Sequence, residues 1–242
     1  MKVAVLIDGG FFLKRAEAQI DNFVIDSEKT ANLIFSYAMK HVDYYNPSKT
    51  TNNKNNRHKG SKSKYEDSDN LYRIFFYDCP PLEKKLHYPI SKKVLNLAKS
   101  ETYLFRSKLF EALKKKRKCA LRLGYLAENE YDWILKPEVL KKLIKNQKQF
   151  SELIDSDFRP SYRQKAVDSK IAIDIASLSF KKQVDRIVLV AGDADFVPAS
   201  KLARREGIDF ILDPMENRIA PSLNEHIDGC HSMPLGRKSY NH

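Results

Sequence analysis

Short apolar runs that alternate with helical segments are the feature that most constrains the fold of this 242-residue chain. Four runs rich in Val, Ile, Leu and Phe occupy residues 2–7, 71–78, 187–191 and 208–212. Such runs are typical of strands buried on both faces of a parallel sheet. Between them, as over residues 27–45, apolar residues recur at helical spacing. The pattern predicts an α/β fold with a mainly parallel central sheet and helices on both faces.

The remaining segments complete this alternation. The sequence predicts further helices from about residue 11 and over residues 91–118, 163–179 and 196–206, a strand over 120–126, and a basic amphipathic segment at 136–150.

Residues 46–70 interrupt the pattern. They are dominated by Asn, Lys and Ser and contain almost no apolar residue, so burial cannot offset the entropy of ordering them. We expect a single domain over residues 1–242 with a flexible insertion loop at 46–70.

The charge and the cysteines indicate the class of partner and the compartment. A formal net charge of +12 favours a polyanion, above all nucleic acid, although a basic surface without a ligand is an alternative. Cys79, Cys119 and Cys230 are odd in number and lack metal-type spacing, which favours reduced thiols in a cytoplasmic protein. The apolar run at the N-terminus is too short to span a membrane, so no membrane partner is expected.

Four of the predicted strands lead into an aspartate. These are Asp8, Asp78, Asp193 and Asp213, and the carboxyl ends of parallel strands form the edge where ligands bind in open α/β sheets. Any one of them alone is explained as a turn or cap residue. Several carboxylates in one cleft repel one another unless a cation neutralises them. The set therefore predicts a site for Mg²⁺ or Mn²⁺.

Helical positions extend this acidic set. Asp168 shares a helix face with Ile171 and Ile175, and a charge on a buried stripe requires a partner or a metal. Asp174 points to a different face. Asp195 directly precedes the helix that starts near residue 196, where it is expected to cap that helix.

Four stretches of the chain, in order, resemble one known family. VAVLIDGGFF, RIFFYDCPP, QKAVDSKIAIDIASL and IVLVAGDADFVPASKLARREGIDFIL together are similar to the NYN domain, the branch of the PIN-like nucleases that includes the LabA-like proteins. Two positions depart from the family pattern. Ala166 stands where the family often has glycine, a change expected to be tolerated, and the residues after Asp8 lack the asparagine that many members carry there.

The resemblance implies a Rossmann-like PIN fold and a divalent-metal site that cleaves RNA. By position, the family's four acids correspond to Asp8, Asp168, Asp193 and Asp195. Asp8 and Asp193 are then the primary metal ligands, and the other two bind directly or through water. A water activated by the metal attacks the phosphorus in line, and one carboxylate accepts its proton. The candidate phosphate-binding residues, which lie close in sequence to these acids, are Lys14, Arg15, Arg163 and Lys165.

Two other functions stay open at this level. A nuclease-like fold can serve as a catalytically silent module that binds RNA or a partner protein. Metal-dependent phosphatase or phosphotransfer chemistry on a small substrate also uses such acidic sites, although it needs no extended cationic surface. The sequence leaves open whether the RNA is single-stranded or structured, and whether the protein forms a homo-oligomer.

Overall fold

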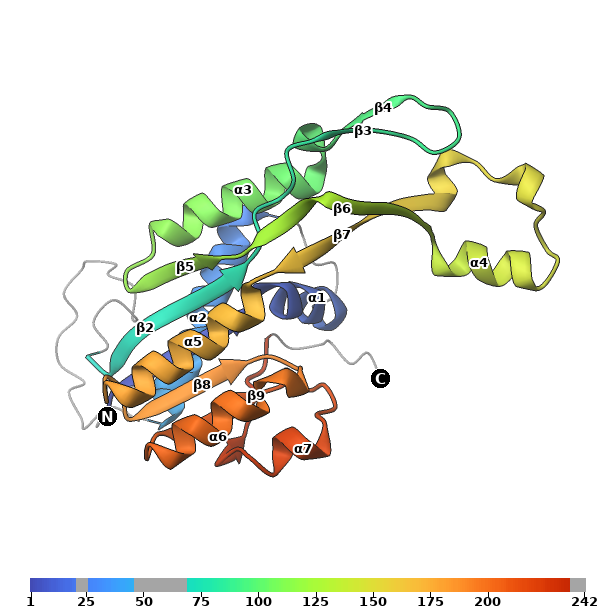
Figure 1. The fold of residues 1–242 in the computed structure, drawn as a ribbon. Helices are drawn as coiled ribbons and strands as arrows, with labels where there is room; N and C mark the ends of the chain where they lie inside the picture. The colour runs from blue at the N-terminus through green and yellow to red at the C-terminus, as the bar shows by residue number, and fades with distance from the viewer. Residues whose placement is uncertain (21–25, 46–68, 236–242) are drawn as a thin grey trace, which may run out of the picture.

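A computed structural model describes residues 1–20, 26–45 and 69–235 of the chain, and its centre is a six-stranded sheet (Figure 1). Every pairing in this sheet is parallel, and its strand order is β10-β9-β8-β1-β2-β5. The predicted α/β architecture is confirmed. The strands are β1 (Val3–Asp8), β2 (Leu71–Asp78), β5 (Cys119–Leu123), β8 (Arg186–Val190), β9 (Asp209–Asp213) and β10 (Gly229–Cys230).

The centre of the sheet is buried on both faces because its inner strands carry consecutive apolar residues. In β1, Val5 and Ile7 belong to one apolar core, and Ala4 and Leu6 belong to a second core on the opposite face. All four side chains are fully buried. Successive side chains of a strand point to opposite faces, so a continuous apolar run requires helices on both sides.

Helices cover each face of the sheet (Figure 1). The helices of the first core are α1 (Gly9–Gln19), α2 (Ser27–Tyr45) and α3 (Glu101–Lys114). Those of the second core are α5 (Val167–Phe180), α6 (Val197–Arg205), which follows the 3₁₀ turn η4 (Ala194–Phe196), and the short α7 (Pro221–Asn224).

An antiparallel hairpin projects from the sheet as an arm (Figure 1). Its strands are β6 (Tyr125–Leu135) and β7 (Phe158–Lys165), joined by α4 (Pro137–Ile144), η2 (Phe150–Glu152) and η3 (Asp155–Asp157). A second hairpin precedes α3 and consists of β3 (Lys85–His87), β4 (Val94–Asn96) and the turn η1 (Leu97–Lys99). The two hairpins touch where the rings of Tyr88 and Trp133 lie 5.4 Å apart.

Three of the predicted elements are wrong in extent. The expected helix over 91–118 begins only at Glu101, because the preceding leucines pair in the β3–β4 hairpin and Ser100 Oγ caps the helix by accepting from Tyr103 N (3.2 Å). The expected helix over 163–179 begins at Val167, since the three residues before Ala166 finish β7. The expected strand over 120–126 is split between β5 and β6 at Gly124.

The insertion predicted at 46–70 lies outside the described residues, except for a turn at Asp69 and Asn70. The single-domain organisation stays a prediction. No helix among residues 1–20, 26–45 and 69–235 combines the length and the apolar character needed to span a membrane.

Candidate active site

The sheet changes winding direction between β1 and β8, and two of the predicted aspartates lie on either side of this point. From β1 the chain continues to β2 on one side, whereas β8 and β9 lie on the other. Asp8 is the last residue of β1, and Asp193 follows the end of β8 in the next loop. Ligands in open α/β sheets bind at this crevice, outside the carboxyl ends of the strands.

Asp8 combines a capping role with an unfavourable charge. Its Oδ1 accepts a hydrogen bond from the backbone N–H of Phe11 (3.0 Å) at the start of α1. The side chain is only half-exposed, and burial raises the pKa of its carboxyl above the usual 3.8. Repulsion from Asp168 and Asp78 raises this pKa further, so Asp8 lies close to other anions.

Asp168 lies in the first turn of α5 and is exposed, so the expectation that it sits on the buried stripe is wrong. Its neighbour Val167 turns inward with Ile171 and Ile175, because the helix begins one turn later than predicted. Burial, followed by repulsion from Asp193 and Asp195, raises the pKa of Asp168. The charge of Asp168 therefore interacts with Asp8 at the end of β1 and with the two aspartates in the loop after β8.

Asp193 and Asp195 are both exposed in the turn after β8. Asp193 Oδ1 accepts from the backbone N–H of Asp195 (3.1 Å) and caps η4. The expectation that Asp195 caps the next helix is wrong, since the cap residue of α6 is Phe196 and it makes no side-chain cap hydrogen bond. The turn therefore presents two carboxylates to solvent.

Gly192 gives the loop of Asp8 and the loop of Asp193 room to meet. A Cβ atom at Gly192 would lie 2.5 Å from the ring of Phe11, which follows Asp8 at the start of α1. The backbone of Gly192 is not left-handed, so the space for Phe11, and not the turn, is what requires a glycine here. Phe11 thus packs one acidic loop against the other.

Two of the four strand-end aspartates have a structural role instead. Asp213 is fully buried and accepts hydrogen bonds from Tyr37 Oη (2.5 Å) and the Met215 N–H (2.7 Å), with His41 Nε2 at 2.7 Å. Asp78 is 2% exposed and pairs with Arg106. We call Asp78 and Asp213 the buried pair.

Asp174 also has protein partners. Its Oδ2 accepts from Arg122 Nε (2.9 Å) and from Tyr77 Oη (2.8 Å). Asp8, Asp168, Asp193 and Asp195 differ from these three, since none of them forms an ion pair with a residue that the structure describes. We call these four aspartates the open group.

The open group supplies suitable donors for a metal but not a finished cage. Within the described ranges, no three or more His, Cys, Asp or Glu side chains are arranged to hold a metal ion, so the predicted convergence on one point is not present. Mutual repulsion accounts for this, as do the caps that use an oxygen of Asp8 and of Asp193. Carboxylates nevertheless suit a hard cation, and Mg²⁺ commonly takes only one or two of them and keeps several waters. The donor set therefore fits Mg²⁺ or Mn²⁺.

The four predicted phosphate-binding residues lie in different settings. Lys14 is exposed on α1 and lines a cavity of about 290 Å³ together with Gly10. Arg15 directs Nε (3.1 Å) and Nη2 (2.8 Å) to the carbonyl of Met215, which gives it a structural partner. Arg163 is exposed and Lys165 is half-buried near the end of β7, just before the start of α5.

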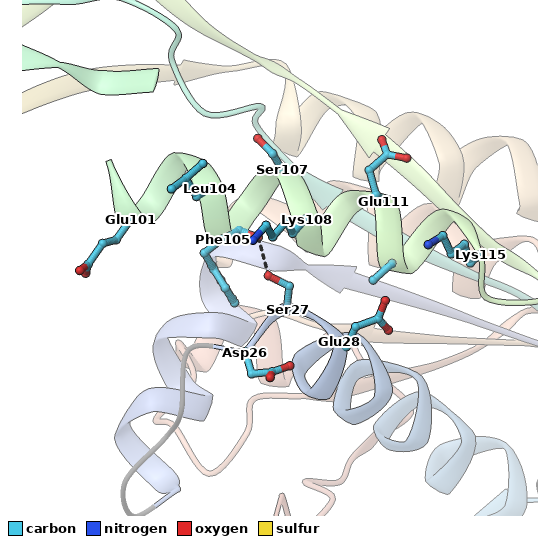
Figure 2. Close-up of a pocket in the computed structure, with 11 residues that line it drawn as sticks. Asp26, Ser27, Glu28, Glu101, Leu104, Phe105, Ser107, Lys108, Glu111 and Lys115 are labelled. Atoms are coloured by element: carbon cyan, nitrogen blue, oxygen red, sulfur yellow. Dashed lines mark hydrogen bonds between the residues drawn. The ribbon is translucent and has the colours of Figure 1, made fainter. Parts of the chain in front are cut away.

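A roomier cavity, of about 870 Å³, lies between the beginning of α2 and α3 and contains none of the predicted site residues (Figure 2). Ser27 Oγ donates to the carbonyl of Phe105 (3.0 Å) at its base. Acidic side chains, among them Glu28 and Glu111, share its lining with Lys108 and Lys115. The wide opening and mixed charge do not favour a site for a polyanion there.

Arg106 is the residue near the edge that sequence reasoning missed. It pairs with Asp78 and lines the 290 Å³ cavity next to Lys14. The sequence does contain a pattern that indicates a partner for Arg106. It lies four residues before Phe110 and seven before Leu113, on the buried stripe of α3. A charge at such a position requires a partner.

A comparison with protein families agrees with the fold. The sequence profile of the NYN domain family matches residues 88–232, which is more than half of the chain and includes every member of the open group except Asp8. An uncharacterized protein of Methanocaldococcus jannaschii is 31% identical over 81 residues, or 34% of this chain and 34% of that protein. The chain thus spans about a third of the length of this curated relative. A protein of unknown function from Vibrio parahaemolyticus, known from a crystal structure, is 14% identical with a TM-score of 0.43, covering 96% of this chain and 92% of that one.

Proposed function

Because this chain belongs to the NYN domain family of the PIN-like nuclease superfamily, we propose that it is a divalent-metal-dependent endoribonuclease. The observation that carries the proposal is the open group. Asp8, Asp168, Asp193 and Asp195 repel one another at the switch point of the sheet, and the described part of the chain gives them no cationic partner. A site of this kind is at its most stable only when a cation is supplied from outside.

The roles of the acids follow from their positions. Asp8 and Asp193, which flank the switch point, would hold Mg²⁺ or Mn²⁺, with Asp168 and Asp195 beside them. Such a cation neutralises charge on the phosphodiester and acidifies a water at neutral pH. A carboxylate beside the cation can accept the proton of the attacking water, and we propose Asp168 for this role because it lies in the first turn of α5 next to the acids of both loops.

The positive charge of the chain supports RNA as the substrate. The chain combines a formal net charge of +12 with an acidic centre, as we expect of a protein that holds a polyanion over a metal site. Lys14 lies closest in sequence to Asp8, and Arg163 and Lys165 precede Asp168 directly. We propose that these three residues contact phosphates of the RNA backbone, which position a strand without reading its sequence. Because Arg15 holds Met215, we expect it to contribute less.

One observation favours a second candidate function. The described side chains form no ready-made group of three metal ligands, as expected of a catalytically silent module that binds RNA or a protein. The two candidates differ in whether phosphodiester bonds are broken, so a cleavage assay separates them.

The test is cleavage of labelled RNA in Mg²⁺, in Mn²⁺ and in EDTA. Linear single-stranded and hairpin RNAs report activity, and a circular RNA, which has no ends, reports endonucleolytic cleavage. We expect cleavage by the wild type only with metal, and its loss in Asp8→Asn and Asp193→Asn. Asp132→Asn is the matched control, because it removes the same charge from an exposed aspartate of β6. Cleavage that persists in EDTA, or in both Asp→Asn variants, would overturn the proposal, and metal-independent RNA binding without cleavage would favour the silent module.

A further inference from the structure

A third cavity, of about 410 Å³, lies at the carboxyl edge of the sheet, and the proposed cleavage reaction does not use it. It is enclosed by the segment that follows β2, by the beginning of α3, and by the base of the arm formed by β6 and β7. Its size is within the range of small-ligand pockets. We call it the arm pocket, and its lining includes Cys79, Pro81, Leu97, Tyr103, Tyr162 and Gln164.

The arm pocket adjoins the open group. Cys79 follows Asp78 in the sequence, and burial and then the charge of Asp78 raise the pKa of its thiol. A Cβ atom at Gly124 would lie 3.2 Å from Cys79 Sγ and 2.9 Å from Val167 Cγ2, so this wall of the pocket lies near the start of α5, where Asp168 follows Val167. A strand of RNA whose phosphate sits at the open group therefore has the arm pocket beside it.

The walls of the arm pocket suit a flat, partly polar ring. Apolar side chains such as Pro81 and Leu97 form much of the surface, and Tyr103 and Tyr162 provide aromatic rings. The hydroxyl of Tyr162 is buried and has no hydrogen-bond partner among the residues that the structure describes. An unpaired buried hydroxyl is costly, and a ligand in the pocket can supply the missing partner. Gln164, which is exposed, adds an amide able to donate and to accept.

Arg106 stands between the arm pocket and the smaller cavity that contains Lys14, since it lines both. Its Nη1 donates to Asp78, which fixes the guanidinium through a carboxylate that is only 2% exposed. The Arg106 side chain itself is 21% exposed. A guanidinium held in this way presents its remaining donors in a fixed fork, the geometry that favours phosphate.

We propose that the arm pocket binds one unstacked nucleobase of single-stranded RNA, while Arg106 contacts the adjoining phosphate and Asp78 positions Arg106. This inference rests on the proposed function for its choice of ligand. Recognition of unpaired RNA commonly stacks a base on an aromatic ring and reads its edge with hydrogen bonds. In the arm pocket Tyr103 provides the ring for stacking, and Tyr162 and Gln164 read the edge of the base.

Binding of short RNAs to the full-length Asp193→Asn protein tests this, because bound RNA is then not cut. The probes are fluorescent oligomers of A, C, G and U and a double-stranded RNA, measured by anisotropy at one salt concentration. We expect one homopolymer to bind more tightly than the other three, and the duplex to bind more weakly. Equal affinity for all four homopolymers, or a duplex that binds as tightly as the preferred one, would overturn the proposal.

Substitutions in the pocket separate stacking, edge reading and phosphate contact. Added to Asp193→Asn, Tyr103→Ala should weaken binding of the preferred homopolymer about fivefold or more. Tyr44→Ala, which removes a 56% exposed tyrosine at the far end of α2, should change it less than twofold. Tyr162→Phe should cost about three- to tenfold for the preferred homopolymer only, without lowering the melting temperature. Arg106→Lys should weaken all four equally.

The outcomes keep the two proposals apart. Base preference that depends on Tyr103 and Tyr162, in a protein whose wild type does not cleave RNA, would sustain the pocket and overturn the nuclease. Metal-dependent cleavage together with identical effects of Tyr103→Ala and Tyr44→Ala would support the nuclease and overturn the pocket. If no RNA binds, the arm pocket serves some other ligand and the inference fails.

Discussion

The buried pair and the open group occupy the same edge of one sheet, yet their carboxylates are in opposite situations. Each oxygen of Asp213 accepts hydrogen bonds, two of them from the rings of Tyr37 and His41. In the part of the chain that the structure describes, Asp8 and Asp193 accept backbone N–H groups from the turns that follow them and otherwise face other anions or solvent. Strand-end position alone therefore does not separate the two sets, whereas a side-chain partner does: Asp213 lies against His41 and Asp78 pairs with Arg106, and the described residues give the open group no such partner.

The largest predicted effect is the loss of stability when Asp213 is replaced, and its absence would contradict the comparison. We expect Asp213→Asn to lower the free energy of unfolding by about 3–5 kcal/mol, because an amide meets donors that require a buried carboxylate. Burial and the charge of Asp213 raise the pKa of Tyr37, which therefore stays a donor. Urea denaturation measures the change. Asp209→Asn, at the other end of β9 and one-third exposed, is the control and should cost at most about 1 kcal/mol. Equal losses of unfolding free energy for Asp213→Asn and Asp209→Asn would contradict the structural role assigned to Asp213.

The same substitution in the open group should have the opposite profile. For Asp193→Asn we expect kcat/KM for RNA to fall at least 100-fold, which is about 2.7 kcal/mol of transition-state stabilisation. The free energy of unfolding should change by less than about 0.5 kcal/mol, since asparagine caps η4 as well as aspartate does. Measuring both quantities on one preparation is the test, and a variant that keeps its activity but unfolds easily would place Asp193 with the buried pair.

A smaller effect concerns Ala166, which joins the arm to α5 with φ 69°. A left-handed backbone costs an alanine about 1–2 kcal/mol, and a glycine avoids this cost. Glycine, however, gives the unfolded chain more conformational entropy, which offsets part of the stabilisation. Ala166→Gly should therefore stabilise the protein by about 0.5–1 kcal/mol in thermal or urea unfolding. The reverse change, Gly207→Ala at φ +76°, should destabilise it by a similar amount although the site has free space. That the alanine is tolerated stays a prediction, and the structure adds that it carries a backbone cost.

The smallest expected effect is a difference between Asp8→Asn and the wild type in how stability depends on pH. Burial and the charge of Asp168 raise the pKa of Asp8, so the folded protein binds this proton more tightly than the unfolded chain does. Ionised Asp8 therefore costs stability at neutral pH, and the cost disappears as the pH falls through the folded pKa towards 3.8. In EDTA, Asp8→Asn should be more stable than the wild type at pH 7 and lose this advantage on acidification. Mg²⁺ should remove the advantage at pH 7, and an advantage that grows on acidification would contradict the sign.

The sequence predicted most of the central sheet because its strands carry their own signal. Residues 27–45 and 71–78 match α2 and β2 at both ends. The arm was missed because β6 and β7 are held by each other, and residues 163–165, read as helical, complete β7 only through pairing across the hairpin. Local preference cannot reveal a partner that is distant in sequence.

The same limit applies to the candidate site. The strand-end rule found Asp8 and Asp193, but it found Asp78 and Asp213 equally well. Their separation depends on Arg106 and His41, which come from helices on the sheet face and meet the aspartates only in the folded chain. The burial of Asp168 was misjudged for a related reason, since it depended on which residue begins α5.

The place of β1 in the middle of the sheet has a consequence for synthesis of the protein. Asp8 is made well before β8, but its strand pairs with β8, which leaves the ribosome only after residue 190 has been added. Chains grow at about 5–20 residues per second, so roughly ten seconds or more separate the two events. Throughout that interval a nascent chain lacks Asp168 and Asp193 beside Asp8, so the proposed metal site cannot form until most of the described chain has been made.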